Sequence, residues 1–195
     1  MQKQHIRIFV AAALMIAVMA CNNDINRSAS PVELIATNTQ NLGRIDLFDT
    51  TGCDQSVGTI DMRVIEKNAG AQTGGGPSNT TFNQVRVTRY QVTYVRTDGG
   101  KSVPAPFIRS IDTLLAPGGT ASSLTNFLII QSDALTQAPF VALNPINGGK
   151  DPDTGLRTVK MDVVVTLFGE TLAGTNVSAS TRFPLDFCYN CGGCA

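Results

Sequence analysis

Cysteine is the residue type in this chain whose number and spacing could support chemistry. The 195 residues include five cysteines and a single histidine, His5. The last three cysteines are spaced C-x2-C-x2-C over residues 188–194. Thiols at such spacing form disulfides in an oxidising compartment and bind metals or carry redox chemistry in a reducing one. The compartment therefore decides the chemistry of the five positions, which are Cys21, Cys53, Cys188, Cys191 and Cys194.

Residues 1–20 have the pattern of a secretory signal. Lys3 and Arg7 supply a positive start, and the thirteen residues 8–20 are all apolar or small. At about 1.5 Å per residue this segment covers roughly 20 Å, which is short of the ~30 Å hydrocarbon core of a bilayer. The pattern therefore predicts a cleaved signal peptide rather than a membrane span.

The end of this segment, Val18-Met19-Ala20-Cys21, resembles the lipobox of bacterial lipoproteins. The resemblance implies that the signal is cut before Cys21 and that the Cys21 thiol carries a diacylglyceryl group. Two or three acyl chains hold a protein stably at a membrane. We therefore expect a protein anchored at the bacterial cell envelope, facing the periplasm or the exterior. Asn22, in place of aspartate, favours the outer membrane in a host with two membranes.

Removing residues 1–20 changes the inventory of reactive groups. His5 is lost, so the mature chain offers no histidine for a Ser-His-Asp triad, a Cys-His pair, a zinc site or a haem. Lys3 and Arg7 also leave, so the 15 basic residues become 13 against 15 acidic ones. A nucleic-acid binder would carry a positive excess. We expect neither an enzyme nor a nucleic-acid partner.

The cysteines at 188–194 leave one alternative open. With a distant fourth thiolate, their spacing resembles that of ferredoxin cluster ligands. No proline follows the run, it lies at the end of the chain, and exported thiols meet oxidants. We therefore expect disulfides and no cofactor or metal, with a metal-binding or electron-transfer lipoprotein as the alternative. A redox-active C-x2-C is less favoured, because no βαβ pattern surrounds it.

The mature chain shows the period-two alternation of β-strands and no long helical period. Alternation is clearest at 158–168 and 177–187, which a glycine-containing loop connects. Residues 81–97 change parity between Val87 and Tyr90, which predicts a β-bulge. Further strands are expected at 44–48, 57–66, 107–115, 124–131 and 139–143.

These elements predict an all-β fold, an antiparallel two-sheet sandwich of seven or eight strands. The strand count and order resemble the immunoglobulin-like or fibronectin-like sandwich domains of exported bacterial lipoproteins. A barrel or jelly roll remains the alternative. The expected organisation is a signal peptide at 1–20, a lipid anchor and flexible tether at 21–43, the sandwich at 44–188 and a cysteine-rich tail at 189–195.

The resemblance also bears on the disulfides. If 44–48 is the first strand of an immunoglobulin-type sandwich, the start of strand 57–66 and the end of strand 177–187 lie at one pole. Cys53 then lies close to Cys188, Cys191 and Cys194, and our hypothesis is that it pairs with one of them. Four cysteines allow three connectivities. The loop closed by Cys53 exceeds 100 residues, for which the chain-entropy model gives about 4–5 kcal/mol.

Two other motifs are interpreted as structural. Residues 150–155 (KDPDTG) contain part of a calcium-loop pattern, but no acidic residue closes the loop before Glu170, so we interpret them as a turn. Arg86, Arg89 and Arg96 share one strand but not one face, which favours a solvated edge over an anion site.

The sequence thus predicts a lipid-anchored envelope protein that acts as a non-catalytic binding or structural module. Its expected partners are the membrane, through the anchor, and an envelope protein or glycan, through loops at one pole of the sandwich.

Overall fold

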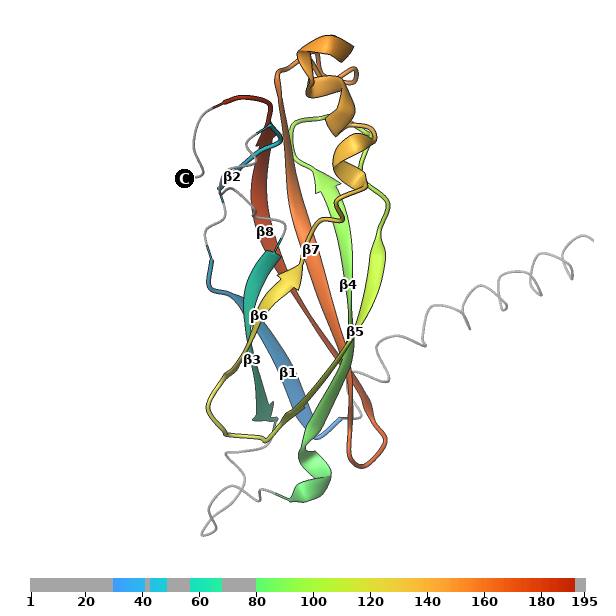
Figure 1. The fold of residues 1–195 in the computed structure, drawn as a ribbon. Helices are drawn as coiled ribbons and strands as arrows, with labels where there is room; N and C mark the ends of the chain where they lie inside the picture. The colour runs from blue at the N-terminus through green and yellow to red at the C-terminus, as the bar shows by residue number, and fades with distance from the viewer. Residues whose placement is uncertain (1–29, 41–42, 49–56, 68–79, 192–195) are drawn as a thin grey trace, which may run out of the picture.

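The computed structural model describes residues 30–40, 43–48, 57–67 and 80–191, and these form a two-layered all-β fold (Figure 1). A three-stranded sheet has the order β1-β3-β6, and a five-stranded sheet has the order β2-β8-β7-β4-β5. The first sheet contains β1 (Val32–Asn38), β3 (Val57–Glu66) and β6 (Ser122–Leu128). The second contains β2 (Arg44–Asp46), β4 (Val85–Arg96), β5 (Phe107–Leu115), β7 (Thr158–Thr171) and β8 (Asn176–Cys188).

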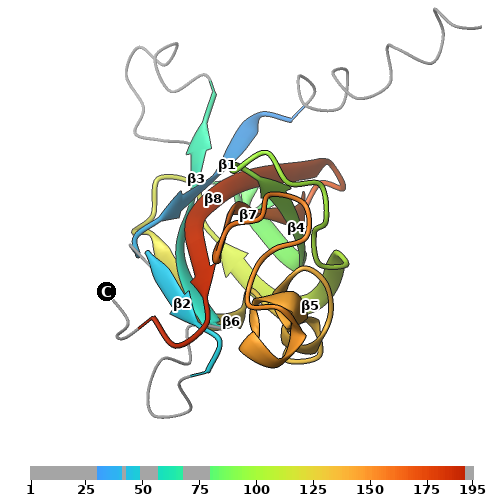
Figure 2. The same cartoon turned by 90° about the horizontal axis from the view of Figure 1, so that it is seen from above.

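Alternation of apolar and polar residues explains why these segments pair face to face. Along β7, every odd residue from Val159 to Thr171 is buried, whereas the even residues are partly or fully exposed. The buried side chains of both sheets meet in one core. Figure 2 shows the strands of the two sheets from above. Phe127 of β6 lies between Tyr90 of β4 and Phe183 of β8, with ring centroids 5.4 and 6.0 Å away. These aromatic contacts join the two layers.

The prediction that all strands are antiparallel was wrong for one pair. β2 pairs with β8 in parallel, from Arg44 opposite Asp186 to Asp46 opposite Cys188. The other ladders are antiparallel. The direction of the chain explains the exception: β1 and β8 both run toward the end that holds β2 (Figure 1), and the chain leaves the first sheet after β1 to join the second as β2. A strand that changes sheet without reversing must pair in parallel with β8.

The predicted boundary of the sandwich at residue 44 was also wrong. β1 lies inside the segment predicted as tether, 21–43, and pairs along its whole length with β3. Val32 and Leu34 are 1% and 3% exposed, so their burial makes this segment part of the core. Residues 21–29 lie outside the described part of the chain. At the other end, residues 189–191 of the predicted tail pack on β2 and belong to the domain.

The strands at 57–66 and 107–115 are confirmed, and so is the bulge in the long strand. The register of β4 shifts between Val87 and Arg89 against both of its neighbours. The strand begins at Val85, later than predicted, because residues Thr81–Asn83 form a short 3₁₀ helix, η1.

The strand predicted at 139–143 was wrong. Residues Phe140–Leu143 form a 3₁₀ helix, η3, between η2 (Ala134–Thr136) and η4 (Pro145–Asn147). Phe140 and Leu143 are the buried residues of η3, and a spacing of three is the period of a 3₁₀ helix. The ring of Phe140 packs 4.5 Å from that of Phe187, so this connection covers one end of the core.

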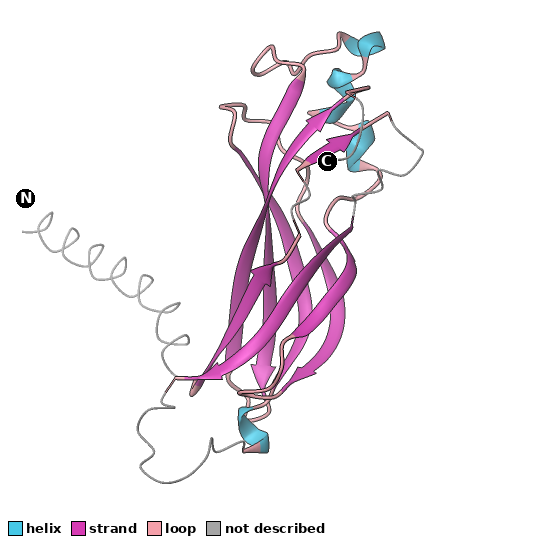
Figure 3. Cartoon of the chain, turned by 90° about the vertical axis from the view of Figure 1, so that its left-hand side faces the viewer, coloured by secondary structure: helices cyan, strands magenta, loops and turns pink. Residues whose placement is uncertain are grey.

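The sandwich has two poles at the ends of its long axis (Figure 3). We call the end that holds η2, η3, η4, β2 and the last residues of β8 the upper pole. The opposite end, with the first residues of β1, η1 and the β7–β8 turn, is the lower pole. β7 has 14 residues, and at about 3.3 Å per residue it gives this axis a length of roughly 45 Å.

Candidate functional site

The two described cysteines of the C-terminal cluster are joined by a disulfide. Cys188 is the last residue of β8, and its bond to Cys191 closes a turn whose Cα atoms lie 6.0 Å apart. Asn190 in this turn has a φ of 49°, a conformation that asparagine tolerates better than most residues. Cys188 is 5% exposed. The disulfide prediction is confirmed for these two residues.

Asp46 of β2 holds this turn in place. Its side chain is buried, and the carboxylate accepts backbone N–H groups of Phe48 (3.0 Å) and of Asn190 and Cys191 (2.9 Å each). The N–H of Leu47 donates to the carbonyl of Cys188 at 2.8 Å. The rings of Phe48 and Tyr189 pack with centroids 5.1 Å apart. β2 and the end of β8 therefore form one ordered unit.

Three of the predicted cysteine positions, Cys21, Cys53 and Cys194, lie outside the described residues. The two that are described cannot act as metal ligands while they are bonded to each other, because a metal requires free thiolates. Within the described ranges, no group of three or more His, Cys, Asp or Glu side chains lies close enough together to hold a metal ion.

A second polar site at the upper pole is centred on Arg96, the last residue of β4. Its guanidinium donates to both carboxylate oxygens of Asp98, at 2.7 and 2.9 Å, and to Oδ2 of Asp151, at 2.7 Å. A further N–H donates to the carbonyl of Ser102 at 3.0 Å. The three charged side chains are at most 3% exposed. This buried cluster, Arg96-Asp98-Asp151, connects the loop after β4 with the long connection before β7.

Hydrogen bonds determine the protonation of this cluster. Burial acts to raise the pKa of Asp98, but Arg96 and the N–H groups of Lys160 and Gly100 outweigh it and hold the pKa at about 2. The pKa of Asp151 is likewise lowered, because Arg96 and Thr154 outweigh the effect of burial. Both carboxylates are thus ionised at neutral pH, and Arg96 offsets one of their two negative charges.

The turn interpretation of residues 150–155 is confirmed. Asp151 Oδ2 accepts both the N–H and the hydroxyl of Thr154, at 3.1 and 2.7 Å, which closes the turn locally. Asp153 accepts the N–H groups of Lys101 and Ser102 from the neighbouring loop, at 2.7 Å each, and these bonds lower its pKa. The carboxylates are thus used in joining two loops.

The predicted solvated edge was wrong, because β4 lies between β7 and β5 in the sheet and Arg96 is buried. Arg86 does lie at the surface, where it pairs with Asp112 at 2.7 Å. Arg89 lies over the ring of Phe168, 4.8 Å from its centroid. The sequence signal that could have identified Arg96 is the turn at 98–100 just after it, which brings Asp98 within reach. Asp151 lies 55 residues away, so no local pattern reveals it.

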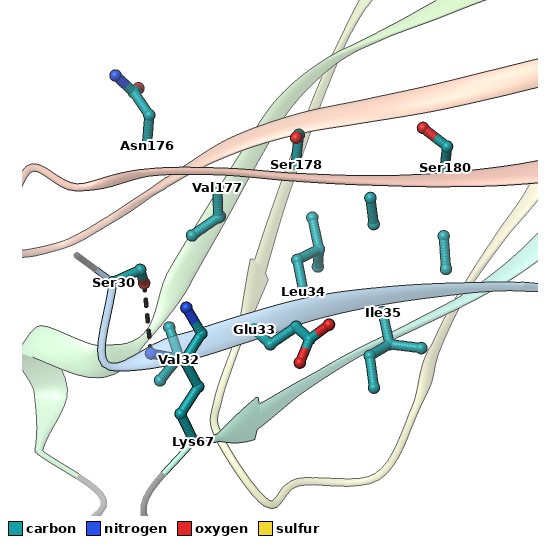
Figure 4. Close-up of a pocket in the computed structure, with 12 residues that line it drawn as sticks. Ser30, Val32, Glu33, Leu34, Ile35, Lys67, Asn176, Val177, Ser178 and Ser180 are labelled. Atoms are coloured by element: carbon teal, nitrogen blue, oxygen red, sulfur yellow. Dashed lines mark hydrogen bonds between the residues drawn. The ribbon is translucent and has the colours of Figure 1, made fainter. Parts of the chain in front are cut away.

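The described residues also line two cavities. One, of about 390 Å³, lies between the first residues of β1 and the first residues of β8 (Figure 4). Ser30 lies at one end and accepts the N–H of Val32 at 3.3 Å. Residues 176–180 line the side formed by β8, where the side chain of Val177 points toward β1 and those of Asn176, Ser178 and Ser180 point away from it. Glu33 and Lys67 are the titratable residues of its lining. The other, of about 320 Å³, lies beside η2 at the upper pole. Neither lining contains a histidine or a pair of carboxylates.

The described part of the chain contains no helix with the length and apolar character needed to cross a membrane. No protein-family model, curated protein or solved structure matches the chain.

Proposed function

We propose that this protein is a lipid-anchored component of the bacterial cell envelope that acts as a non-catalytic binding or structural module. The apolar leader at 1–20 and the lipobox-like residues before Cys21 support the anchor. The sandwich supports the second part, because its polar clusters are used in connecting loops to each other.

We also propose an immunoglobulin-like topology for the sandwich. With β1, β3 and β6 as strands A, B and E, the first sheet has the order A-B-E. With β8, β7, β4 and β5 as G, F, C and C′, the second has the order G-F-C-C′, and β2 is a continuation of A along G. This distribution of strands supports the assignment.

The observation that carries the functional proposal is that the chain enters the domain at one pole while the long connections lie at the other. Nine peptide units separate Cys21 from Ser30, so they reach at most about 32 Å. The long axis is longer, roughly 45 Å. An anchor at Cys21 therefore prevents the domain from inverting, and the upper pole faces away from the membrane. The loops locked by Arg96 are the surface available to a partner there.

Two measurements test this proposal on the full chain expressed with its own leader. Intact-mass analysis of the membrane fraction should show loss of residues 1–20 and the added mass of the acyl groups; an unmodified Cys21 contradicts the anchor.

The second measurement concerns the partner: detergent-extracted protein should capture its envelope partner through the upper pole. Ile146, which is 90% exposed in η4, is the position to change, and Leu172 at the lower pole is the matched control. Ile146→Asp should abolish capture, and Leu172→Asp should preserve it.

We further propose that Cys53 pairs with Cys194. The Cys188–Cys191 bond leaves these two as the remaining cysteines once Cys21 is lipidated. Phe48 and Cys191, which are both described, lie in the unit around Asp46, and Cys53 and Cys194 follow them by five and three residues. Peptide mapping without reduction should recover the two segments as one cross-linked fragment. Recovery of a free Cys53 thiol contradicts the pairing.

The metal-binding or electron-transfer alternative predicts a different result in the same preparation. It requires reduction of the Cys188–Cys191 bond and a stoichiometric metal in protein purified without reductant. Metal analysis of the unreduced protein therefore separates the two functions.

A further inference from the structure

We infer that the lower pole is a membrane-contact surface, at which Phe82 and Leu172 rest in the interface of the lipid bilayer. This inference rests on the proposed anchor at Cys21 and adds the face of the domain that meets the lipid. Phe82 in η1 is 68% exposed and Leu172 in the β7–β8 turn is 45% exposed. The N–H of Leu172 donates to the carbonyl of Gln84 at 2.9 Å, so the two turns are neighbours (Figure 1).

Three described turns of the lower pole carry no charge, while the described connection after β3 contributes Lys67 there. Residues 80–84, 116–121 and 172–176 contain no Asp, Glu, Lys or Arg. The connections of the upper pole, 97–106 and 129–157, contain seven such residues: Asp98, Lys101, Asp133, Lys150, Asp151, Asp153 and Arg157. Moving a charge out of water is costly, whereas an uncharged turn approaches a lipid surface without that cost. The lower pole is thus the end of the domain suited to such contact.

Seven backbone N–H groups of these turns have acceptors within the protein. Near lipid an unpaired N–H group has few water partners, so internal hydrogen bonds lower the cost of approach. The lower-pole N–H groups with internal acceptors belong to Asn83, Gln84, Gly118, Gly119, Leu172, Gly174 and Thr175.

The length and exit point of the N-terminal segment identify a lipid surface as the occupant. The described chain begins at Ser30, at the lower pole, and nine peptide units separate it from Cys21. Their reach of at most about 32 Å confines this pole to the vicinity of the bilayer and raises its effective concentration there. A weak contact made by two apolar side chains is therefore sufficient to orient the domain.

The absence of tryptophan from the sequence permits a direct test. Phe82→Trp introduces a single indole at the lower pole, and Ile146→Trp introduces one at the upper pole as the matched control. Both positions are exposed, so neither change disturbs the core. The lipidated full-length variants are reconstituted in vesicles of phosphatidylethanolamine and phosphatidylglycerol (about 3:1) with and without brominated acyl chains. We expect a blue-shifted emission and at least about threefold stronger quenching by the brominated lipid for Phe82→Trp than for Ile146→Trp.

The outcomes separate this inference from the proposed function. Acylated protein with equal quenching of the two variants overturns the membrane-contact surface and leaves the anchor intact. If Cys21 is not acylated, the proposed function fails. The membrane-contact surface rests on that anchor and is overturned together with it. Emission that depends on protein density in the vesicles, without quenching by lipid, identifies a second copy of the chain as the occupant and also overturns the inference.

Discussion

At the upper pole, 29 residues connect Leu128 of β6 to Thr158 of β7, whereas at the lower pole four residues connect β7 to β8. The long connection is fixed by buried groups: the Arg96-Asp98-Asp151 cluster and the ring of Phe140. The short turn is fixed by its own residues: backbone hydrogen bonds join Thr171 to Gly174 and Thr175, and the Thr171 hydroxyl accepts the N–H of Thr175. Turns of this kind need no buried charge, and their side chains remain free for contact with a surface.

This contrast shows what a long connection requires. A long loop has no strand ladder, so its backbone N–H and C=O groups and its charged side chains must find hydrogen-bond partners elsewhere. At the upper pole a single guanidinium supplies three of these connections, to Asp98, Asp151 and the carbonyl of Ser102. The upper pole should therefore depend on a few buried groups, and the lower pole should tolerate change.

The largest expected effect comes from removing Arg96. Arg96→Met leaves Asp98 and Asp151 buried without their countercharge, and removal of one partner from such a pair costs about 3–5 kcal/mol. Oδ1 of Asp151 already has no hydrogen-bond partner among the described residues, so this carboxylate has little to replace Arg96. Urea unfolding with the disulfides intact measures the change in the free energy of unfolding.

Arg86→Met is the matched control on the same strand. Arg86 forms an equally short bond to Asp112, but both side chains are more than half exposed. Water screens such a pair, so its removal should leave the unfolding midpoint almost unchanged. Equal effects of the two substitutions would contradict the structural role assigned to the buried cluster.

The next effect is the acid sensitivity of the upper pole. The pKa of Asp98 is about 2 in the folded protein, below its ordinary value of 3.8. A carboxyl with a lowered pKa stabilises the folded state above its unfolded pKa, and that stability is lost as the pH falls through the folded value. We expect about 2 kcal/mol to disappear between about pH 4 and pH 2. The loss should be smaller in Arg96→Met, and identical pH profiles for the two proteins would refute this origin.

A somewhat smaller effect is expected from the disulfide at the end of β8. The Cys188–Cys191 bond closes a loop of only four residues, for which the chain-entropy model gives a stabilisation of about 2 kcal/mol. The double substitution Cys188→Ala and Cys191→Ala should lower the free energy of unfolding by that amount. Asp46 should still hold the turn through the N–H groups of residues 190 and 191. Loss of the entire folded state would contradict this division of roles.

Local patterns were sufficient to predict most of the strands and the bulge. The alternation at 57–66 and 107–115 gave the observed bounds, and the change of parity after Val87 marked the shift in register. β1 was missed because its apolar group at 32–36 is short, and its burial depends on β3, about thirty residues further along the chain. η3 was mistaken for a strand because a short apolar segment fits a spacing of two or three equally well.

The candidate site was less predictable, because its members meet only through the fold. Cys188 and Cys191 were identified by spacing alone. Asp46, whose carboxylate holds their turn, is 144 residues from Asn190 and looks like any polar strand residue. Arg96 was assigned to the surface because the alternation along a strand does not reveal that loops elsewhere in the chain cover the end of that strand. Long-range pairing of charged groups is the information that a local pattern lacks.

The smallest expected effect on stability is at the lower pole. Phe82→Ser removes a ring that is 68% exposed and belongs to a 3₁₀ helix without buried residues. Because little apolar area is lost from the core, the free energy of unfolding should change by no more than about 0.5 kcal/mol. Ala134→Ser, on a 3₁₀ helix of equal length at the upper pole, is the control, since Ala134 is 9% exposed and should tolerate a hydroxyl less well. A thermal unfolding scan of the two variants compares the poles directly. If Phe82→Ser proved the more destabilising, the ring would have to be a core contact, and both the tolerance of the lower pole and its availability to a membrane would be refuted together.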